Sequence, residues 1–215
     1  MNPLSLSALG QLNDLRHAAL DALKAKHMYP ALLLLYSYID ICAAVSDEMG
    51  TKDNRLRFET FLKDYAGLSW TTFSTHDLWA ARSSLLHSFS PLGNHTKPGK
   101  GARPIFYFAW PETQAEVQTA LEAKGYGDFV LLDVQTIKFI AVGCFNAMWR
   151  RVDHEPLFEK TLIANSRHLL KDLFQMRLED ELVLIEELAS LARTETDALQ
   201  AAWLLAHRAS IFGLS

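Results

Sequence analysis

The chain has 215 residues and a mass of 24.2 kDa, enough for one large domain or one domain with an appendage. Hydrophobic residues make up 49% and charged residues 21%, a composition that excludes general disorder. The net charge of −4 and the pI near 6.0 argue against a protein that coats nucleic acid, because such proteins are usually basic throughout.

The first two predicted helices differ in how much of their surface is apolar. Leucines and alanines recur at helical spacing between residues 9 and 23, with Ser5 or Ser7 available as the cap. Pro30 suits the first turn of a second helix, which continues to about residue 48 and is apolar nearly all round. Since such a helix must be surrounded by protein, we expect it to be central.

The next two helices are marked by their ends. Asn54 suits the cap of a third helix, which is closed by Gly67. Ser74 and Asp77 have the spacing of a capping box and open a fourth helix, which stops before Pro91. Four helices in this part of the chain predict a helical bundle.

Residues 92–133 interrupt the helical pattern. A loop rich in Gly, Pro and Lys covers 92–103, and the β-forming residues of PIFYFAW that follow it predict a strand. The expected partner strand is DFVLLDV at 128–134, with a surface helix over 111–124 between the two. The sequence therefore predicts a small β insertion around 104–134.

The remainder of the chain again has a helical pattern. Four more helices are expected, at about 134–151, from Pro156, and at about 176–193 and 196–212. The predicted fold is therefore mainly α, with a helical bundle over residues 1–152 that contains the insertion. Residues 153–215 form a C-terminal helical extension that packs on the same domain or on a partner.

Three features predict a cytoplasmic protein without a membrane partner. Cys42 and Cys144 lie in apolar, helix-like stretches, which is typical of buried thiols in a reducing compartment. No apolar stretch approaches the ~18 residues of a membrane span, since the dense run Ala31–Tyr36 soon meets Asp40. The N-terminus lacks a basic region and carries Asp14 early, unlike a signal peptide.

Positive charge is segregated in one stretch of this acidic protein. The 34 residues from Leu78 to Pro111 contain no Asp or Glu, but they hold Arg82, Lys97, Lys100 and Arg103. A segregated positive region attracts a polyanion locally. The three loop residues Lys97, Lys100 and Arg103 are therefore candidate RNA contacts, and a merely solvated loop is the alternative.

Arg82 and His87 form the one constellation that indicates chemistry. The chain has no Gly-rich phosphate loop and no His or Cys pattern typical of a metal site, so we expect no metal and no cofactor. At ~100° per residue, Arg82 and His87 diverge by ~140° around a helix, whereas Ser83 lies only ~40° from His87. Arg82 emerges from an apolar stripe, so its guanidinium must find an anion or a polar cleft. His87 is in the last turn, where the helix dipole favours its protonated form.

The segment RSSLLH, Arg82 to His87, resembles the Arg-x4-His signature of HEPN domains (higher eukaryotes and prokaryotes nucleotide-binding). The preceding apolar helix, ALLLLYSYIDICAAV, resembles their second helix, which often carries an acidic residue where Asp40 stands. The resemblance covers about residues 5–152. Active members commonly have Asn, Asp or His after the arginine, whereas this chain has Ser83.

The resemblance implies a HEPN-like bundle that acts as a metal-independent endoribonuclease, an activity found in toxin–antitoxin and antiviral systems. The 2′-hydroxyl of a ribose would attack the adjacent phosphate, with His87 transferring the proton and Arg82 holding the phosphate oxygens. Ser83 would orient the phosphate or the imidazole, and Asp40 would position Arg82. The resemblance also implies a homodimer with both motif helices at its interface, RNA as substrate, and an antitoxin or other protein as a further partner.

Two other functions are compatible with the same residues. In a non-catalytic interaction module, Arg82 is a structural arginine paired with Asp40 or with a helix end, and His87 is an interface histidine. Alternatively, the bundle binds a nucleotide or another small polar ligand without turnover.

Overall fold

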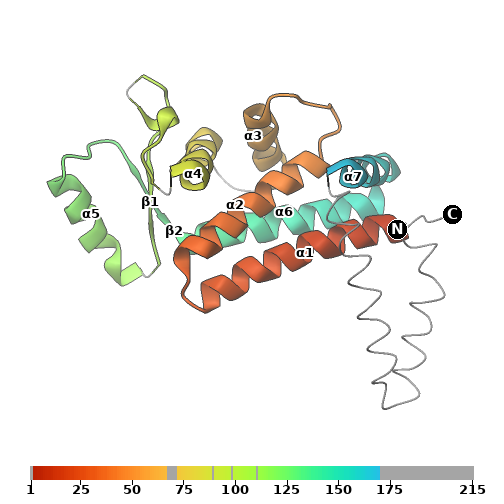
Figure 1. The fold of residues 1–215 in the computed structure, drawn as a ribbon, viewed down its shortest axis with the longest axis horizontal. Coiled ribbons are helices and arrows are strands. Elements are labelled where there is room, and N and C mark those ends of the chain that lie inside the picture. Colours follow the sequence, from red (N-terminus) through yellow and green to blue (C-terminus); the bar gives the residue numbers. More distant parts are fainter. Residues whose placement is uncertain (1, 67–71, 89, 98, 110, 170–215) are drawn as a thin grey trace, which may run out of the picture.

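The structure is a computed structural model that describes residues 2–66, 72–88, 90–97, 99–109 and 111–169. Its helices and strands are, in chain order, α1 (Pro3–Lys24), α2 (Met28–Val45), α3 (Asn54–Tyr65), α4 (Thr75–Ser88), β1 (Ile105–Phe108), α5 (Gln114–Ala123), β2 (Val130–Asp133), α6 (Val134–His154) and α7 (Pro156–Leu169) (Figure 1). The mainly α fold with a small β insertion is thus confirmed. The helices expected at about 176–193 and 196–212 lie outside the described residues.

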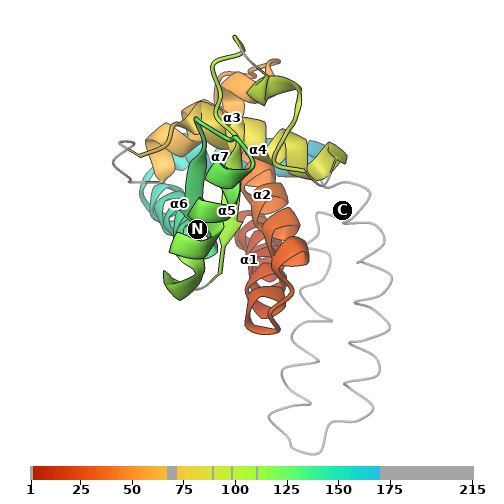
Figure 2. The ribbon, with the colours of Figure 1, turned by 90° about the vertical axis from the view of Figure 1, so that its left-hand side faces the viewer.

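Helix α2 is central, as its uniformly apolar sequence predicts. It packs against α1, α3, α4, α6 and α7, and half of its length is buried. The long helices α1, α2 and α6 lie side by side, with α3 and α4 along one flank (Figures 1 and 2). Helix α7 closes one end of this layer, and α5 with the two strands lies at the other end.

By length and composition, α2 is also apolar enough to cross a membrane. Its 18 residues, Met28–Val45, meet that criterion, so the expectation that no apolar stretch approaches the length of a span is wrong. The dense run Ala31–Tyr36 is only part of this helix, and the single charge of Asp40 does not take the whole helix below the criterion. The central helix of a soluble protein meets the same criterion.

Both cysteines face the core, as predicted. Cys42 on α2 and Cys144 on α6 are completely buried and free of disulfide bonds. Burial raises the pKa of Cys42 to about 12 and places the pKa of Cys144 well above its usual value. Neither thiol therefore ionises near neutral pH.

Two helices begin at caps that differ from the expected ones. Asn2, not Ser5 or Ser7, caps α1, because its side chain accepts a hydrogen bond from the amide two residues ahead at 2.9 Å. Asp53 caps α3 by accepting from the second amide beyond it at 2.8 Å, which makes Asn54 the first helical residue. In both cases another good cap residue stands nearby in the sequence, and the position of the first turn decides between them.

The predicted strands pair as a small parallel sheet. Ile105 lies opposite Val130, and Phe108 lies opposite Asp133. Parallel pairing requires a crossover connection, which α5 supplies. Gly125 follows α5 with a φ of +82°, a left-handed conformation that favours glycine at the end of a helix. Strand β1 contacts α4 and strand β2 contacts α6. The insertion therefore packs against α4, the helix that carries Arg82 and His87.

Candidate functional site

The start of α4 is the predicted capping box, and it also anchors the basic loop. The amide of Ser74 donates to Asp77 Oδ2 at 2.9 Å, and the amide of Asp77 donates to Ser74 Oγ at 3.0 Å. The same carboxylate, only 2% exposed, accepts from the backbone N–H of Arg103 at 2.7 Å and from its guanidinium at 2.9 Å. The end of the 92–103 loop is therefore tied to the beginning of α4.

The guanidinium of Arg82 is held by two neighbours. Its Nη2 donates to Oδ2 of Asp40 on α2, forming an ion pair, and its Cζ lies 4.9 Å from the ring centroid of Trp79. Both charged side chains are mostly buried, with 18% of Arg82 and 22% of Asp40 exposed. The anion that the apolar surroundings of Arg82 require is thus Asp40. Arg82 Nε and Asp40 Oδ1 are buried and have no hydrogen-bond partner among the described residues.

His87 and Ser83 lie on a different side of α4, beside an open cavity. The cavity has a volume of 590 Å³ and is walled by α4 and by residues 92–97 of the loop. On the loop side, Lys97 and His95 line the cavity. The imidazole of His87 is exposed and makes no hydrogen bond or ion pair with the part of the chain that the structure describes. It is therefore available to a ligand in this cavity.

The loop approaches α4 most closely at Gly93. A Cβ at this position would lie 2.0 Å from Ser84 Oγ, a distance that no real side chain tolerates. The amide of Gly93 donates to Thr96 Oγ1 at 3.0 Å, and that hydroxyl donates to the Gly93 carbonyl at 3.1 Å, which makes a compact turn. Glycine at position 93 thus brings Lys97 beside α4.

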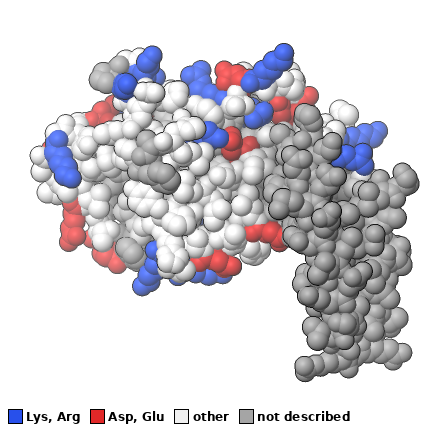
Figure 3. All heavy atoms as spheres, viewed as in Figure 1, with Lys and Arg blue, Asp and Glu red and all other residues white. Residues whose placement is uncertain are grey.

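Only two of the three basic loop residues keep an uncompensated charge. The guanidinium of Arg103 pairs with Asp77 and also donates to the carbonyl of Thr72 at 3.0 Å. Arg103 therefore has a structural contact in place of a free charge. Lys97 and Lys100 are exposed and form no ion pair within the described ranges. On the face seen in Figure 3, basic and acidic side chains are interspersed along the edges rather than gathered into one basic surface.

The structure thus divides the predicted site residues into separate groups. Arg82 and Asp40 form a pair between α4 and α2, whereas Ser83, His87 and Lys97 share the cavity on another side of α4. Arg82 does not line that cavity. The angular separation expected from helical geometry is therefore realised, and a single chain does not bring the arginine and the histidine to one point.

Two further residues, Trp79 and His95, lie at these sites although the sequence alone does not mark them as site residues. Trp79 stands three residues before Arg82 on the same helix, a spacing that brings side chains together and was a usable signal. His95 lines the cavity with His87, but their meeting depends on the path of the loop. No local sequence pattern indicates that path.

Comparisons of the chain with protein-family models, with curated proteins and with solved structures found no match. The resemblance to HEPN domains therefore depends on Arg82, His87 and the apolar helix that carries Asp40. Among the described residues, no group of three or more His, Cys, Asp or Glu side chains is arranged to hold a metal ion.

The anchoring role of Asp77 predicts a pH-dependent loss of stability. Burial raises the pKa of this carboxyl, but hydrogen bonds from the backbone and side chains of Arg103 and Ser74 outweigh it, so the pKa lies below the usual 3.8. A lowered carboxyl pKa adds stability above the unfolded-state pKa, and this stability is lost as the pH falls through the folded-state pKa. We expect Asp77→Asn to lower the free energy of unfolding by about 1–3 kcal/mol at pH 7.

Urea unfolding at pH 7 and at a pH of about 3.5 measures this effect. The difference between the wild type and Asp77→Asn should shrink at the lower pH. Asp128→Asn is a matched control, because Asp128 is exposed and makes no hydrogen bond or ion pair within the described part of the chain. If the free energies of unfolding of the wild type and Asp77→Asn differ by the same amount at both pH values, the proposed role of Asp77 is contradicted.

Proposed function

We propose that the protein is a metal-independent endoribonuclease of the HEPN type. One observation carries this proposal: His87 and Ser83 of α4 line an open cavity together with Lys97, and the Arg82–Asp40 pair lies on another side of the same helix. The cavity volume of 590 Å³ is large enough for a nucleotide unit of an RNA strand. The proposed location is cytoplasmic.

The chemistry requires a proton acceptor and positive charge beside one phosphate. The 2′-oxygen of a ribose attacks the adjacent phosphorus, and the P–O5′ bond breaks, leaving a 2′,3′-cyclic phosphate and a 5′-hydroxyl. His87 takes the proton from the 2′-hydroxyl and returns a proton to the departing 5′-oxygen, because its imidazole is exposed and has no competing partner among the described residues. Lys97 and Ser83 contact the phosphate oxygens from opposite walls of the cavity.

Arg82 joins this reaction only in an assembly of two protomers. Within one chain, its guanidinium is directed to Asp40 and away from the cavity of His87. A twofold axis beside α4 brings the arginine of one protomer towards the histidine of the other, through an isologous interface. Asp40 then fixes the direction of the guanidinium, whose planar set of donors suits phosphate oxygens. RNA is the substrate, and an antitoxin or another protein is a further partner.

A non-catalytic interaction module is the second candidate, and the Arg82–Asp40 pair favours it. Asp40 and the ring of Trp79 stabilise Arg82 within one chain, so the arginine needs no phosphate to explain its position. In that function the pair ties α4 to α2, and His87 is a surface histidine. Since the pair is compatible with both functions, His87 is the residue that separates them.

We expect His87→Ala to reduce RNA cleavage by about 100-fold or more, because it removes the group that transfers the proton. The melting temperature should stay unchanged, since the exposed imidazole makes no contact that stabilises the described fold. The measurement is cleavage of a labelled single-stranded RNA in the presence of EDTA. His154→Ala is the matched control, because His154 is also an exposed histidine in the last turn of its helix.

Arg82→Ala should lower both cleavage and the melting temperature, because it leaves the carboxylate of Asp40 without its partner. Wild-type cleavage that needs a divalent ion, or equal cleavage by the wild type and His87→Ala, would contradict the nuclease. A wild type that cleaves no RNA would favour the interaction module.

We expect Lys97→Ala combined with Lys100→Ala to weaken RNA binding and to flatten its salt dependence. Each lost phosphate contact on a single strand reduces the slope of log K against log salt by about 0.7, so two contacts reduce it by about 1.4. Filter binding or fluorescence anisotropy between low and physiological salt measures the slope. Lys52→Ala with Lys160→Ala removes two exposed lysines away from the cavity and should leave the slope unchanged. An equal slope in the Lys97/Lys100 variant and the wild type would mean that the loop is only solvated.

We expect a symmetric dimer with α4 at its interface. Both native thiols are buried, so a cysteine introduced by Ser83→Cys reacts without interference from them. Oxidation should link two protomers through position 83, and light scattering of the wild type should give twice the mass of one chain at micromolar concentration. Thr119→Cys, exposed on α5, is the control and should not form the link. A monomeric wild type, or a dimer that the Ser83→Cys variant does not crosslink, would rule out the composite site.

A further inference from the structure

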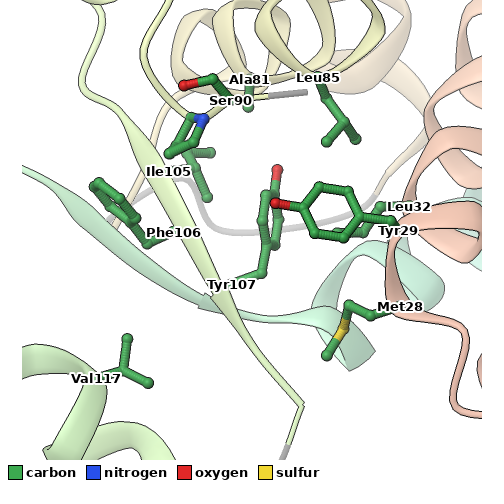
Figure 4. Close-up of a pocket in the computed structure, with 11 residues that line it drawn as sticks. Met28, Tyr29, Leu32, Ala81, Leu85, Ser90, Ile105, Phe106, Tyr107 and Val117 are labelled. Atoms are coloured by element: carbon green, nitrogen blue, oxygen red, sulfur yellow. The ribbon is translucent and has the colours of Figure 1, made fainter. Parts of the chain in front are cut away.

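A second cavity lies between α2, α4, α5 and β1, apart from the cavity of His87. Its volume is 320 Å³, and no residue lines both cavities. Figure 4 shows its lining, in which Met28, Leu32 and Leu85 provide apolar side chains and Phe106 a ring. Tyr29 is 53% exposed, so the cavity reaches the surface beside this side chain. An apolar cavity of about 150 Å³ is already able to bind benzene.

The hydroxyl of Tyr107 is placed to donate to a ligand in this cavity. Tyr107 points into the cavity (Figure 4). Its Oη lies 2.6 Å from Oη of Tyr36, which is completely buried. Burial raises the pKa of both tyrosines, so both hydroxyls keep their hydrogens at neutral pH. Either oxygen can donate within the pair. When Tyr36 donates to Tyr107, the hydrogen of Tyr107 has no acceptor among the described residues. A buried donor without an acceptor costs free energy, which an acceptor in the cavity would recover.

The lining also indicates the charge of the missing partner. None of the 11 lining residues is Asp, Glu, Lys, Arg or His, so a charged ligand would be buried without compensation. The rings of Tyr29, Phe106 and Tyr107 offer surfaces for a flat apolar group. We infer that this cavity binds a small, neutral, ring-containing molecule whose oxygen accepts a hydrogen bond from Tyr107.

Two probes that differ at one position test this inference. Acetophenone carries a carbonyl oxygen where ethylbenzene carries a methylene group, and both are neutral rings of nearly the same size. Binding is followed by NMR of protein labelled at the methionine methyl groups, because Met28 lines the cavity. Met148, completely buried elsewhere, and Met49, 87% exposed, are internal references. We expect both probes to shift the Met28 signal and to leave these two references in place.

Tyr107→Phe removes the donor and keeps the ring. It should weaken binding of acetophenone by about 2- to 10-fold and leave the affinity for ethylbenzene unchanged or higher. Val117→Phe, which retains both tyrosines and fills space from α5, should weaken binding of both probes. A Met28 signal that neither probe moves, equal weakening of both probes by Tyr107→Phe, or no effect of Val117→Phe would each overturn the inference.

Discussion

The ion pair between Arg82 and Asp40 links α4 to the central helix of the bundle. Helix α2 is apolar on nearly all sides, and Asp40 is the acidic residue within it. A mostly buried carboxylate needs a cationic partner, and Arg82 reaches it from α4 with its guanidinium against the ring of Trp79. Removing either charge would leave the other partly buried and unpaired. The pair and the buried apolar side chains of α4 together orient this helix, so that Ser83 and His87 lie on a different side of it.

The loop after α4 is then positioned by contacts at both of its ends. Near α4, the absence of a side chain at Gly93 permits contact with Ser84. At the far end, Arg103 binds the carboxylate of Asp77, which also caps the first turn of α4. One helix therefore holds both ends of the segment that contains Lys97 and Lys100. A chain with a net charge of −4 thus presents two uncompensated lysines along α4, with Lys97 beside His87 and Lys100 beside His76 in the first turn.

The features that the sequence predicts correctly are those determined by neighbouring residues. The Ser74–Asp77 capping box depends on a spacing of three, and the central position of α2 follows from its own composition. Other contacts depend on the path of the loop after α4. Arg103 pairs with Asp77, and Gly93 approaches Ser84, only because this loop turns back along the helix, so no local sequence pattern indicates either contact. In the sequence Arg103 therefore resembles a free cation, whereas in the structure it is paired with Asp77. The caps of α1 and α3 were misplaced for a smaller reason, since several good cap residues stand close together.

The two sides of α4 provide chemically opposite environments. Ser83 and His87 border an open cavity with Lys97 on its far wall, whereas Leu85 borders a cavity without any charged side chain. The chain leaves α4 between them, so residues 90 and 91 line the apolar cavity and residues 92–97 line the polar one. Any displacement of this short connection alters the walls of both. Helix α4 and the segment that follows it therefore contribute a wall to each cavity, and the two walls meet at residues 91 and 92.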